Sequence, residues 1–315
     1  MGYRVGRSLQ ARRVGVRPGG GGSVTLCPYC GANVERNPGE VVLTCPYCGT
    51  AFTVEGGEVG EHLMGRINYS VQQVFENFKS WALRMPETPN DFLEKALFKS
   101  YEVRFYPFWV FVFQARVSYA GGYEDLTLPV HVPGHTSMLG TPLEKLRPTL
   151  GGKVFYSHRY VVNAGAKLVN PDVGPEDAEK KAVEQAGEMA LESLSIRFGG
   201  RARLRVESLA VSERKLVHHP VIHATYTYSG REYKFMADAS DSRILYAEIP
   251  VEAKFRAAAA AGGLASLGLA LASLLAARDA PMFAATSLLG FLVVAGVSLS
   301  KAFAPTAVVT KSFAS

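Results

Sequence analysis

Cysteine and tryptophan are scarce in this sequence, and several motifs that mark common enzymes are missing. The chain holds 4 cysteines and 2 tryptophans among 315 residues, which is too few cysteines for the dense disulfide framework of a small secreted protein. It has no glycine-rich phosphate-binding loop, no G-x-S-x-G nucleophile elbow and no H-E-x-x-H helix. These absences exclude P-loop nucleotide hydrolases, hydrolases built on that elbow and zincin-type metalloproteases.

The N-terminal end lacks both acidic residues and an apolar central segment. Residues 1–18 contain no Asp or Glu, and a glycine run at residues 19–22 follows them. The same segment carries five arginines, Arg4, Arg7, Arg12, Arg13 and Arg17. Without an apolar centre it does not resemble a secretory signal. We predict a disordered basic tail over residues 1–23, which could contact anionic lipid headgroups or nucleic acid, or could be only solvated.

The few cysteines are arranged in one repeated motif. The sequence C-P-Y-C-G occurs twice, and its thiols belong to Cys27, Cys30, Cys45 and Cys48. Two such turns can place four thiolates around one tetrahedral Zn²⁺, and the glycine after each second cysteine relieves the turn. Short β-prone segments precede both turns. We therefore predict a zinc ribbon over residues 24–60 with one structural zinc ion; rubredoxin-type iron is the main alternative, and two disulfides are a weaker one.

A site with four thiolate ligands has no open position for water or substrate. Such a site contributes folding energy rather than chemistry, so the ribbon should act as a surface. Between Val24 and Glu61 the only basic side chain is Arg36, against five acidic ones, Glu35, Glu40, Glu55, Glu58 and Glu61. A bound Zn²⁺ with four thiolates would add about two further negative charges. We therefore expect the ribbon to repel a phosphate backbone, and nucleic acid to be an unlikely partner.

Two long segments near the C-terminus lack charged residues. Residues 257–277 and 282–300 carry no charge, and only a short turn with one Arg and one Asp separates them. Each run is long enough to cross the hydrocarbon core of a bilayer as a helix. We predict a transmembrane helical hairpin over residues 255–303, with a buried hairpin of a soluble protein as the alternative. Small residues at helical spacing would let the two helices pack closely.

The charges that flank this hairpin predict its orientation. Lys254 and Arg256 precede the first helix, and Lys301 and Lys311 follow the second. The positive-inside rule then places both termini in the cytoplasm, with residues 304–315 as a cytoplasmic tail. A reducing cytoplasm also suits four thiols that await a metal. We expect a two-pass protein of the cell membrane.

The segment between ribbon and hairpin, residues 61–250, predicts an α+β domain with antiparallel strands. Apolar spacing predicts helices over residues 71–85, 92–98 and 175–197, the last with Ala182, Ala186, Met189, Ala190 and Leu194 on its apolar face. Strands are expected over residues 101–119, 123–131, 153–163, 202–211, 216–228, 232–237 and 244–249. The segments Tyr106-Pro107-Phe108-Trp109 and His219-Pro220-Val221-Ile222 echo each other at the start of long strands, so the domain could consist of two repeated subdomains.

Histidines give this domain its one candidate chemical site. His219 and His223 would share one face of a strand, as metal ligands or as an acid–base pair, although histidines at a strand edge are usually ordinary polar neighbours. No carboxylate lies beside them in the sequence to orient a ring. His131 and His135 are expected in a loop, and Asp238, Asp241 and Ser242 in a turn. The aromatic run from Phe105 to Phe113 is expected in the core or on a membrane-proximal face.

The order of these parts resembles a family of membrane-anchored bacterial and archaeal proteins. Its members carry an N-terminal zinc ribbon of the general transcription factor IIB type, and some accompany phage-shock-type membrane-stress proteins. The resemblance rests on the two C-P-Y-C-G motifs, Phe78-Lys79-Ser80-Trp81, Pro89-Asn90-Asp91-Phe92, Tyr106-Pro107-Phe108-Trp109, Pro220, residues 228–235 and Ile249-Pro250. Two positions depart from the pattern: residues 238–243 lack a glycine-bearing turn, and Ile222 replaces an aromatic residue. The resemblance implies an adaptor rather than an enzyme.

Three functions follow from the sequence. The first is a membrane-anchored adaptor or scaffold that displays the ribbon and the α+β domain to protein partners at the cytoplasmic face of the membrane. The second is a membrane-tethered nucleic-acid binder that uses the arginine-rich tail. The third is a metalloenzyme built on His219 and His223. We favour the first because the metal site is closed and the ribbon is acidic.

Overall fold

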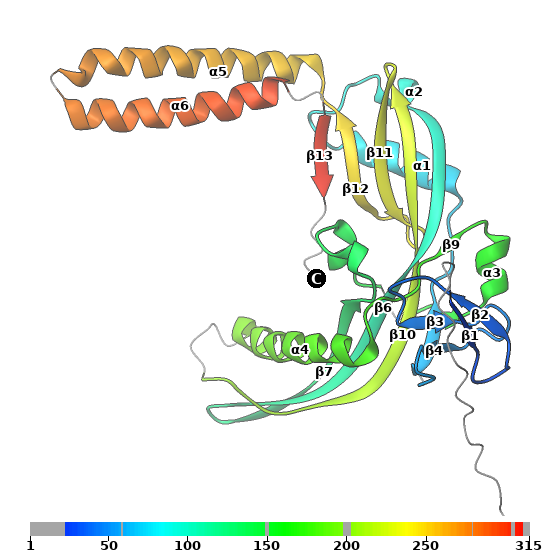
Figure 1. Ribbon diagram of the computed structural model, residues 1–315. Helices are drawn as coiled ribbons and strands as arrows, with labels where there is room; N and C mark the ends of the chain where they lie inside the picture. The colour runs from blue at the N-terminus through cyan, green and yellow to red at the C-terminus, as the bar shows by residue number, and fades with distance from the viewer. Residues whose placement is uncertain are drawn as a thin grey trace, which may run out of the picture.

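The structure is a computed structural model that describes residues 23–57, 59–148, 151–197, 203–278, 280–303 and 306–310. The predicted basic tail lies outside these residues, apart from Ser23. Figure 1 shows a small cysteine-bearing module, a long curved sheet and a separate pair of helices. Within the described residues the sheet contains nine strands, most of them antiparallel. The prediction of a largely antiparallel domain and two apolar C-terminal helices is confirmed.

Two very long strands form the backbone of the sheet. Strand β6 (Leu97–Tyr119) pairs antiparallel with β10 (Arg205–Tyr228) along almost its whole length, and Tyr106 lies opposite His219. Each long strand continues through a tight turn into a second strand, β7 (Gly122–Pro133) after β6 and β11 (Arg231–Asp238) after β10. The pieces predicted at residues 202–211 and 216–228 therefore form one strand, which begins at Arg205; residue 202 lies outside the described residues.

A helix covers each of the two hairpins. Helix α1 (Val71–Ala82) packs Val74, Phe75 and Phe78 against β10 and β11, and a capping box formed by Ser70 and Gln73 fixes its start. Helix α4 (Pro175–Arg197) packs on β6 and β7. Its buried residues are Pro175, Ala178, Ala182, Ala186, Ala190 and Leu194. The order helix, long strand, second strand thus occurs twice, as α1-β6-β7 and as α4-β10-β11. Helix α1 covers the hairpin of the second set, and α4 covers the hairpin of the first.

The two prolines of the sequence echo lie inside the long strands rather than at their starts. On the side away from β10, β6 pairs with β9 (Lys167–Leu168) before Pro107 and with β7 after it. On the side away from β6, β10 pairs with β5 (Glu61–Met64) before Pro220 and with β11 after it. A proline has no N–H for a ladder, and these junctions are positions where that loss is tolerated. A glycine lies against each ring: a Cβ on Gly134 would be 3.0 Å from Pro107 Cβ, and one on Gly65 would be 2.7 Å from Pro220 Cδ.

Short elements fill the spaces around the sheet. They are α2 (Phe92–Lys95), the 3₁₀ helices η1 (Thr136–Met138) and η2 (Pro142–Lys145), β8 (Val154–Phe155) and α3 (His158–Asn163). Two predictions are corrected here. The strand expected over residues 153–163 is a two-residue strand followed by a helix, because the Ser157 side chain accepts from the Tyr160 N–H and starts the helix there. The helix expected over residues 92–98 ends at Lys95, and β6 begins two residues later.

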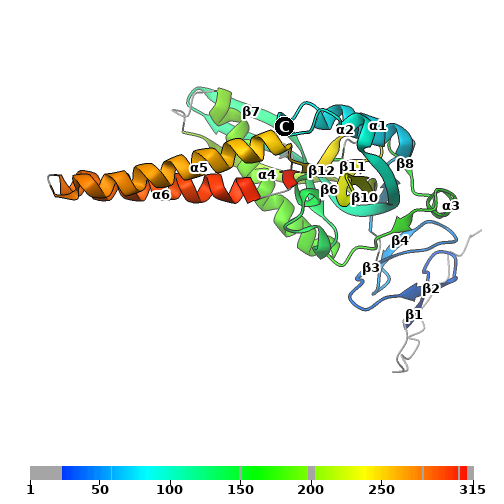
Figure 2. The same ribbon diagram turned by 90° about the horizontal axis from the view of Figure 1, so that it is seen from above.

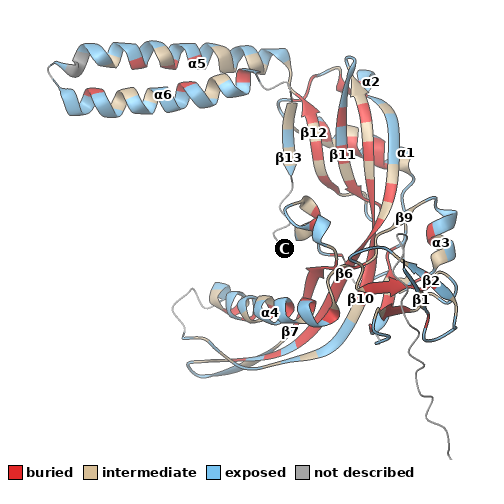
Figure 3. Ribbon diagram, in the orientation of Figure 1, coloured by how far each residue is buried: buried red, intermediate tan, exposed pale blue. Residues whose placement is uncertain are grey.

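The core follows the sheet through its whole length. Figure 3 shows buried residues concentrated in the strands and on the sheet-facing side of the helices. The aromatic run of β6 is part of this core, since Phe105, Phe108, Trp109, Phe111 and Phe113 are all at most 1% exposed. Met189 is 37% exposed, so its expected place on the buried face of α4 is wrong. Its helical angle turns it away from the alanine stripe.

The two apolar helices lie apart from the sheet (Figure 2). Helix α5 (Ala253–Ser273) continues through η3 (Leu274–Ala277) to α6 (Pro281–Phe303), and both are long and apolar enough to cross a membrane. Large apolar side chains such as Leu264, Leu292 and Val294 are exposed. Small residues form the contact between the helices, where Gly263 faces Leu299 and Ser266 is buried.

The hairpin is inserted between two neighbouring strands of the sheet. Strand β12 (Ile244–Pro250) leads into α5, and β13 (Thr306–Thr310) follows α6 and pairs antiparallel with β12. The expected tail at residues 304–315 is therefore corrected, because residues 306–310 are a strand of the sheet. Arg256 Nε donates to the Ala302 carbonyl at 3.1 Å, which ties the two helix ends together. Both ends of the hairpin thus meet the same sheet edge.

Candidate metal centre

The N-terminal module is built from two small hairpins, and each cysteine pair lies in a tight turn next to them. Strands β1 (Ser23–Leu26) and β2 (Asn33–Arg36) flank the first turn, and β3 (Val42–Thr44) and β4 (Ala51–Thr53) flank the second. In each turn the glycine N–H donates to the carbonyl of the first cysteine at 2.9 Å. Gly31 and Gly49 have φ values of 71° and 78°, a conformation that favours glycine.

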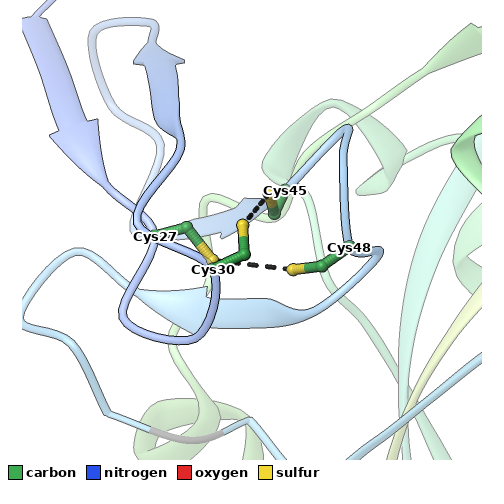
Figure 4. Close-up of side chains that lie close together, drawn as sticks. All are labelled: Cys27, Cys30, Cys45 and Cys48. Atoms are coloured by element: carbon green, nitrogen blue, oxygen red, sulfur yellow. Dashed lines mark hydrogen bonds between the residues drawn. The ribbon is translucent and has the colours of Figure 1, made fainter.

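The four thiols converge on one point (Figure 4). The sulfur of Cys27 lies 3.7 Å from that of Cys48, and the sulfur of Cys30 lies 3.6 Å from that of Cys45. All four sulfur atoms lie within 4.8 Å of one another, and none is in a disulfide. A tetrahedron with metal–sulfur bonds of about 2.3 Å has sulfur–sulfur edges of about 3.8 Å. The predicted residues Cys27, Cys30, Cys45 and Cys48 therefore form a group that could hold a metal ion.

The thiols differ in their surroundings. Burial raises the pKa of Cys27 and raises the pKa of Cys45 to about 12. Burial also raises the pKa of Cys48. Hydrogen bonds with Thr50 and with the thiols of Cys45 and Cys27 outweigh this effect and lower the pKa of Cys48 to about 6. A metal ion binds thiolates, so it would have to displace protons from Cys27 and Cys45 at neutral pH.

The cysteine module is joined to the sheet by buried contacts. Nδ1 of His62, on β5, lies 3.0 Å from the carbonyl oxygen of Gly49, the residue after the last cysteine. The ring of His62 stacks on Tyr156 at 4.2 Å, and its Nε2 lies 2.8 Å from Nδ1 of His218. Val42 and Ala51 belong to the same core cluster as Trp109. The module and the sheet therefore pack as one body.

The structure places His219 and His223 on the same face of β10 but gives them different partners. His219 is 1% exposed, and its Nε2–H donates to Asp238 at 2.7 Å. Nζ of Lys153 lies 2.9 Å from its Nδ1. His223 Nε2 instead lies 2.9 Å from the Tyr106 hydroxyl. Among the described residues, the four cysteines are the group of His, Cys, Asp and Glu side chains placed to hold a metal.

Sequence reasoning missed Asp238 and Lys153. Asp238 was expected in a turn, but it ends β11, is 1% exposed and accepts hydrogen bonds from His219 and from the Ser240 N–H. Although burial opposes it, the contact with His219 lowers the pKa of Asp238, so the carboxylate stays charged. Burial lowers the pKa of Lys153 to about 8. The antiparallel pairing of β10 and β11 brings the carboxylate to a histidine that lies 19 residues earlier in the sequence.

The remaining polar predictions divide in the same way. His131 was predicted both as the last residue of the strand over residues 123–131 and as part of a loop with His135. The strand is confirmed, since His131 is a buried residue of β7 whose Nε2 lies 3.0 Å from the Pro148 carbonyl. His135 lies outside the strand and caps η1, as a loop residue should. Asp241 and Ser242 lie in the turn between β11 and β12, where Ser242 has a φ of 63°.

Comparisons with protein-family models, with curated proteins and with solved structures found no match to this chain. The geometry of the site and the arrangement of the elements are therefore the evidence for its function.

Proposed function

We propose that this protein is a membrane-anchored adaptor that holds one structural zinc ion and presents a cytoplasmic surface to protein partners in a membrane-stress response. The observation that carries this proposal is the four-thiol group packed against the sheet. Four ligands complete a tetrahedral site, so the metal would stabilise the module without binding a substrate. The contacts through Gly49, Val42 and Ala51 make the stabilised module part of the larger domain.

The exposed face of the module has the chemistry of a protein-binding surface. The tyrosines of the two C-P-Y-C-G motifs, Tyr29 and Tyr47, are 54% and 76% exposed. Val24 and Leu26 on β1 are 59% and 52% exposed. Tyrosine is enriched at protein interfaces, where its ring supplies contact area and its hydroxyl a hydrogen bond. The excess of acidic residues around this surface disfavours nucleic acid and favours a partner with basic residues.

The two apolar helices supply the anchor. Their exposed leucines and valines would be covered by lipid, and both ends of the hairpin return to one sheet edge. The domain and both flanks of the hairpin would then lie on the same side of the membrane. By the positive-inside rule, the basic residues Lys254, Arg256 and Lys301 favour the cytoplasm for that side. A reporter at the C-terminus that becomes fluorescent only in the cytoplasm should be bright, and a dark reporter would refute this orientation.

Metal content tests the first part of the proposal. The purified full-length protein should contain one zinc ion per chain, and the variant Cys27→Ser/Cys30→Ser should contain none. Iron at one ion per chain would replace zinc in the proposal, and a wild-type protein without metal would overturn it.

Site-specific crosslinking tests the partner. A photoreactive residue at Tyr47 should capture a discrete protein in intact cells, and the same residue at Tyr123 should not. Tyr123 is a matched control because it is a 61% exposed tyrosine at the distant turn between β6 and β7. Loss of the crosslink in the Cys27→Ser/Cys30→Ser background would tie the partner to the metal-bound module. Capture of nucleic acid alone, or equal capture at both positions, would contradict the adaptor.

A further inference from the structure

A groove in the central domain remains outside the adaptor proposal. It lies between the loop that carries η1 and η2 and the strands β6, β10 and β11, and its volume is about 670 Å³. Small-molecule sites in proteins have volumes of about 300–1,000 Å³. Pro142, Leu143 and Met236 give it an apolar wall, and Arg104, Tyr106 and His223 lie at its polar side.

The polar side forms a chain of hydrogen-bond donors that ends in the groove. Burial raises the pKa of Tyr106. A hydrogen bond between the Arg104 guanidinium and the Tyr106 hydroxyl partly offsets this rise. A guanidinium has only donors, so the phenol oxygen accepts there. The same hydroxyl lies 2.9 Å from His223 Nε2 and can donate its O–H to that nitrogen. Burial, and then the charge of Arg104, lower the pKa of His223 to about 4. The ring is thus neutral at pH 7, and in the tautomer whose Nε2 accepts from Tyr106 its one proton is on Nδ1.

The Nδ1–H of His223 has no hydrogen-bond partner among the described residues, although the ring is largely buried. This nitrogen is accessible rather than enclosed, and His223 lines the groove. A ligand in the groove can therefore reach this donor. The partner that fits it is a ligand with an anionic oxygen.

The charges of the lining favour an anion. Arg104 and Lys234 are the two cations of the lining, and Glu102 is its one carboxylate. That carboxylate is already shared between Arg104 at 2.5 Å and Lys167 at 3.3 Å. The Nζ atom of Lys234 has no carboxylate partner among the described residues, since its contact with Glu248 is through the backbone N–H. The residues that line the groove thus carry one more positive charge than negative charges, and Lys234 supplies it at the rim.

We propose that this groove binds an organic anion, with its phosphate or carboxylate oxygen on the His223 Nδ1–H between Arg104 and Lys234 and its apolar part against Leu143 and Met236. The anion comes from an anionic lipid headgroup or from a soluble metabolite of the same chemistry. This site is separate from the cysteine module, so it stands whether or not the adaptor proposal does.

Titration calorimetry on the full-length protein in neutral detergent tests the site, with hexyl phosphate as the probe. Wild type should bind it saturably. His223→Leu replaces the ring with an apolar side chain of similar bulk and removes the donor. We expect at least about a tenfold loss of affinity, as for the loss of a hydrogen bond to a charged group. Lys234→Gln lies on the exposed rim and should fold normally, with a loss of about threefold or more. Lys180→Gln, on the exposed side of α4, should bind as wild type.

Nanodiscs distinguish the two sources of the anion. If phosphatidylglycerol in the disc weakens the binding of hexyl phosphate relative to phosphatidylcholine alone, the headgroup occupies the groove; if it has no effect, the ligand is soluble, and either result supports the site. Absence of saturable binding by wild type at millimolar hexyl phosphate would overturn the proposal. So would wild-type affinity in a folded Lys234→Gln protein together with wild-type affinity in a folded His223→Leu protein.

Discussion

Acidification from pH 7 to pH 5 should destabilise this protein strongly, because several histidines are buried in their neutral form. Burial is the main cause that lowers the pKa of His62, His131 and His223 to about 4 each. In the unfolded chain a histidine has a pKa of about 6.5. The unfolded state therefore binds protons first as the pH falls, so the stability is complete above about pH 6.5 and is lost progressively down to about pH 4.

The size of the effect follows from the same values. At pH 5 an unfolded histidine is almost fully protonated and a folded one with a pKa of about 4 is almost fully neutral, which costs about 2 kcal/mol of unfolding free energy for each ring. Three such rings remove about 6 kcal/mol between pH 7 and pH 5. This loss is comparable with the whole stability of a typical domain, about 5–15 kcal/mol. Urea unfolding in detergent micelles at the two pH values, followed by circular dichroism, measures it.

Loss of metal at low pH would act in the same direction, so the experiment needs a variant that is remote from the cysteines. His131 lies on β7, and its Nδ1 is buried without a partner among the described residues, so His131→Phe removes a titrating ring and loses one hydrogen bond, that of Nε2 with the Pro148 carbonyl. The difference in stability between pH 7 and pH 5 should shrink by about 2 kcal/mol in this variant. An unchanged difference in the folded His131→Phe protein would refute the assignment of acid lability to buried histidines.

Two further predictions concern packing. Phe78→Ala should lower the unfolding free energy by about 3–5 kcal/mol in urea unfolding, because Phe78 is fully buried and its ring stacks on Phe235 at 4.2 Å; a loss below about 1 kcal/mol would show that the cluster repacks. Gly263→Ile should separate α5 from α6, since even a Cβ there would be 2.7 Å from Leu299 Cγ. Protease sensitivity of the turn between the helices should rise in that variant and stay unchanged in Gly262→Ile, where no atom lies within 4 Å.

Local patterns predicted most of the elements. The paired cysteine motifs gave the positions of four thiols that the structure brings within 4.8 Å of one another, and the uncharged runs gave both apolar helices. The alanine stripe of α4 is visible from its spacing of four residues. These signals are local, since each depends on residues within one turn, one helix or one short loop.

Contacts between distant segments could not be predicted in this way. Asp238 reads as a turn residue because it precedes Ala239-Ser240-Asp241, and only the register of β11 on β10 places it against His219. Strand β13 is a short segment after an apolar helix, and its pairing with β12 depends on the hairpin that returns the chain to the sheet. The echo around Pro107 and Pro220 was visible, but its meaning required both strand junctions.

The insertion of the helical hairpin between β12 and β13 sets a distance. Two residues separate β12 from α5, and two separate α6 from β13, so each connection spans at most about 10 Å. A flexible linker of about 20 residues has a root-mean-square end-to-end distance of about 25 Å, so a domain on such a linker would have no fixed height above the membrane. With the hairpin in a bilayer, the sheet would instead keep one height and one tilt above the lipid surface. A protein that binds the cysteine module, as proposed, would then meet it at a fixed height above the lipid.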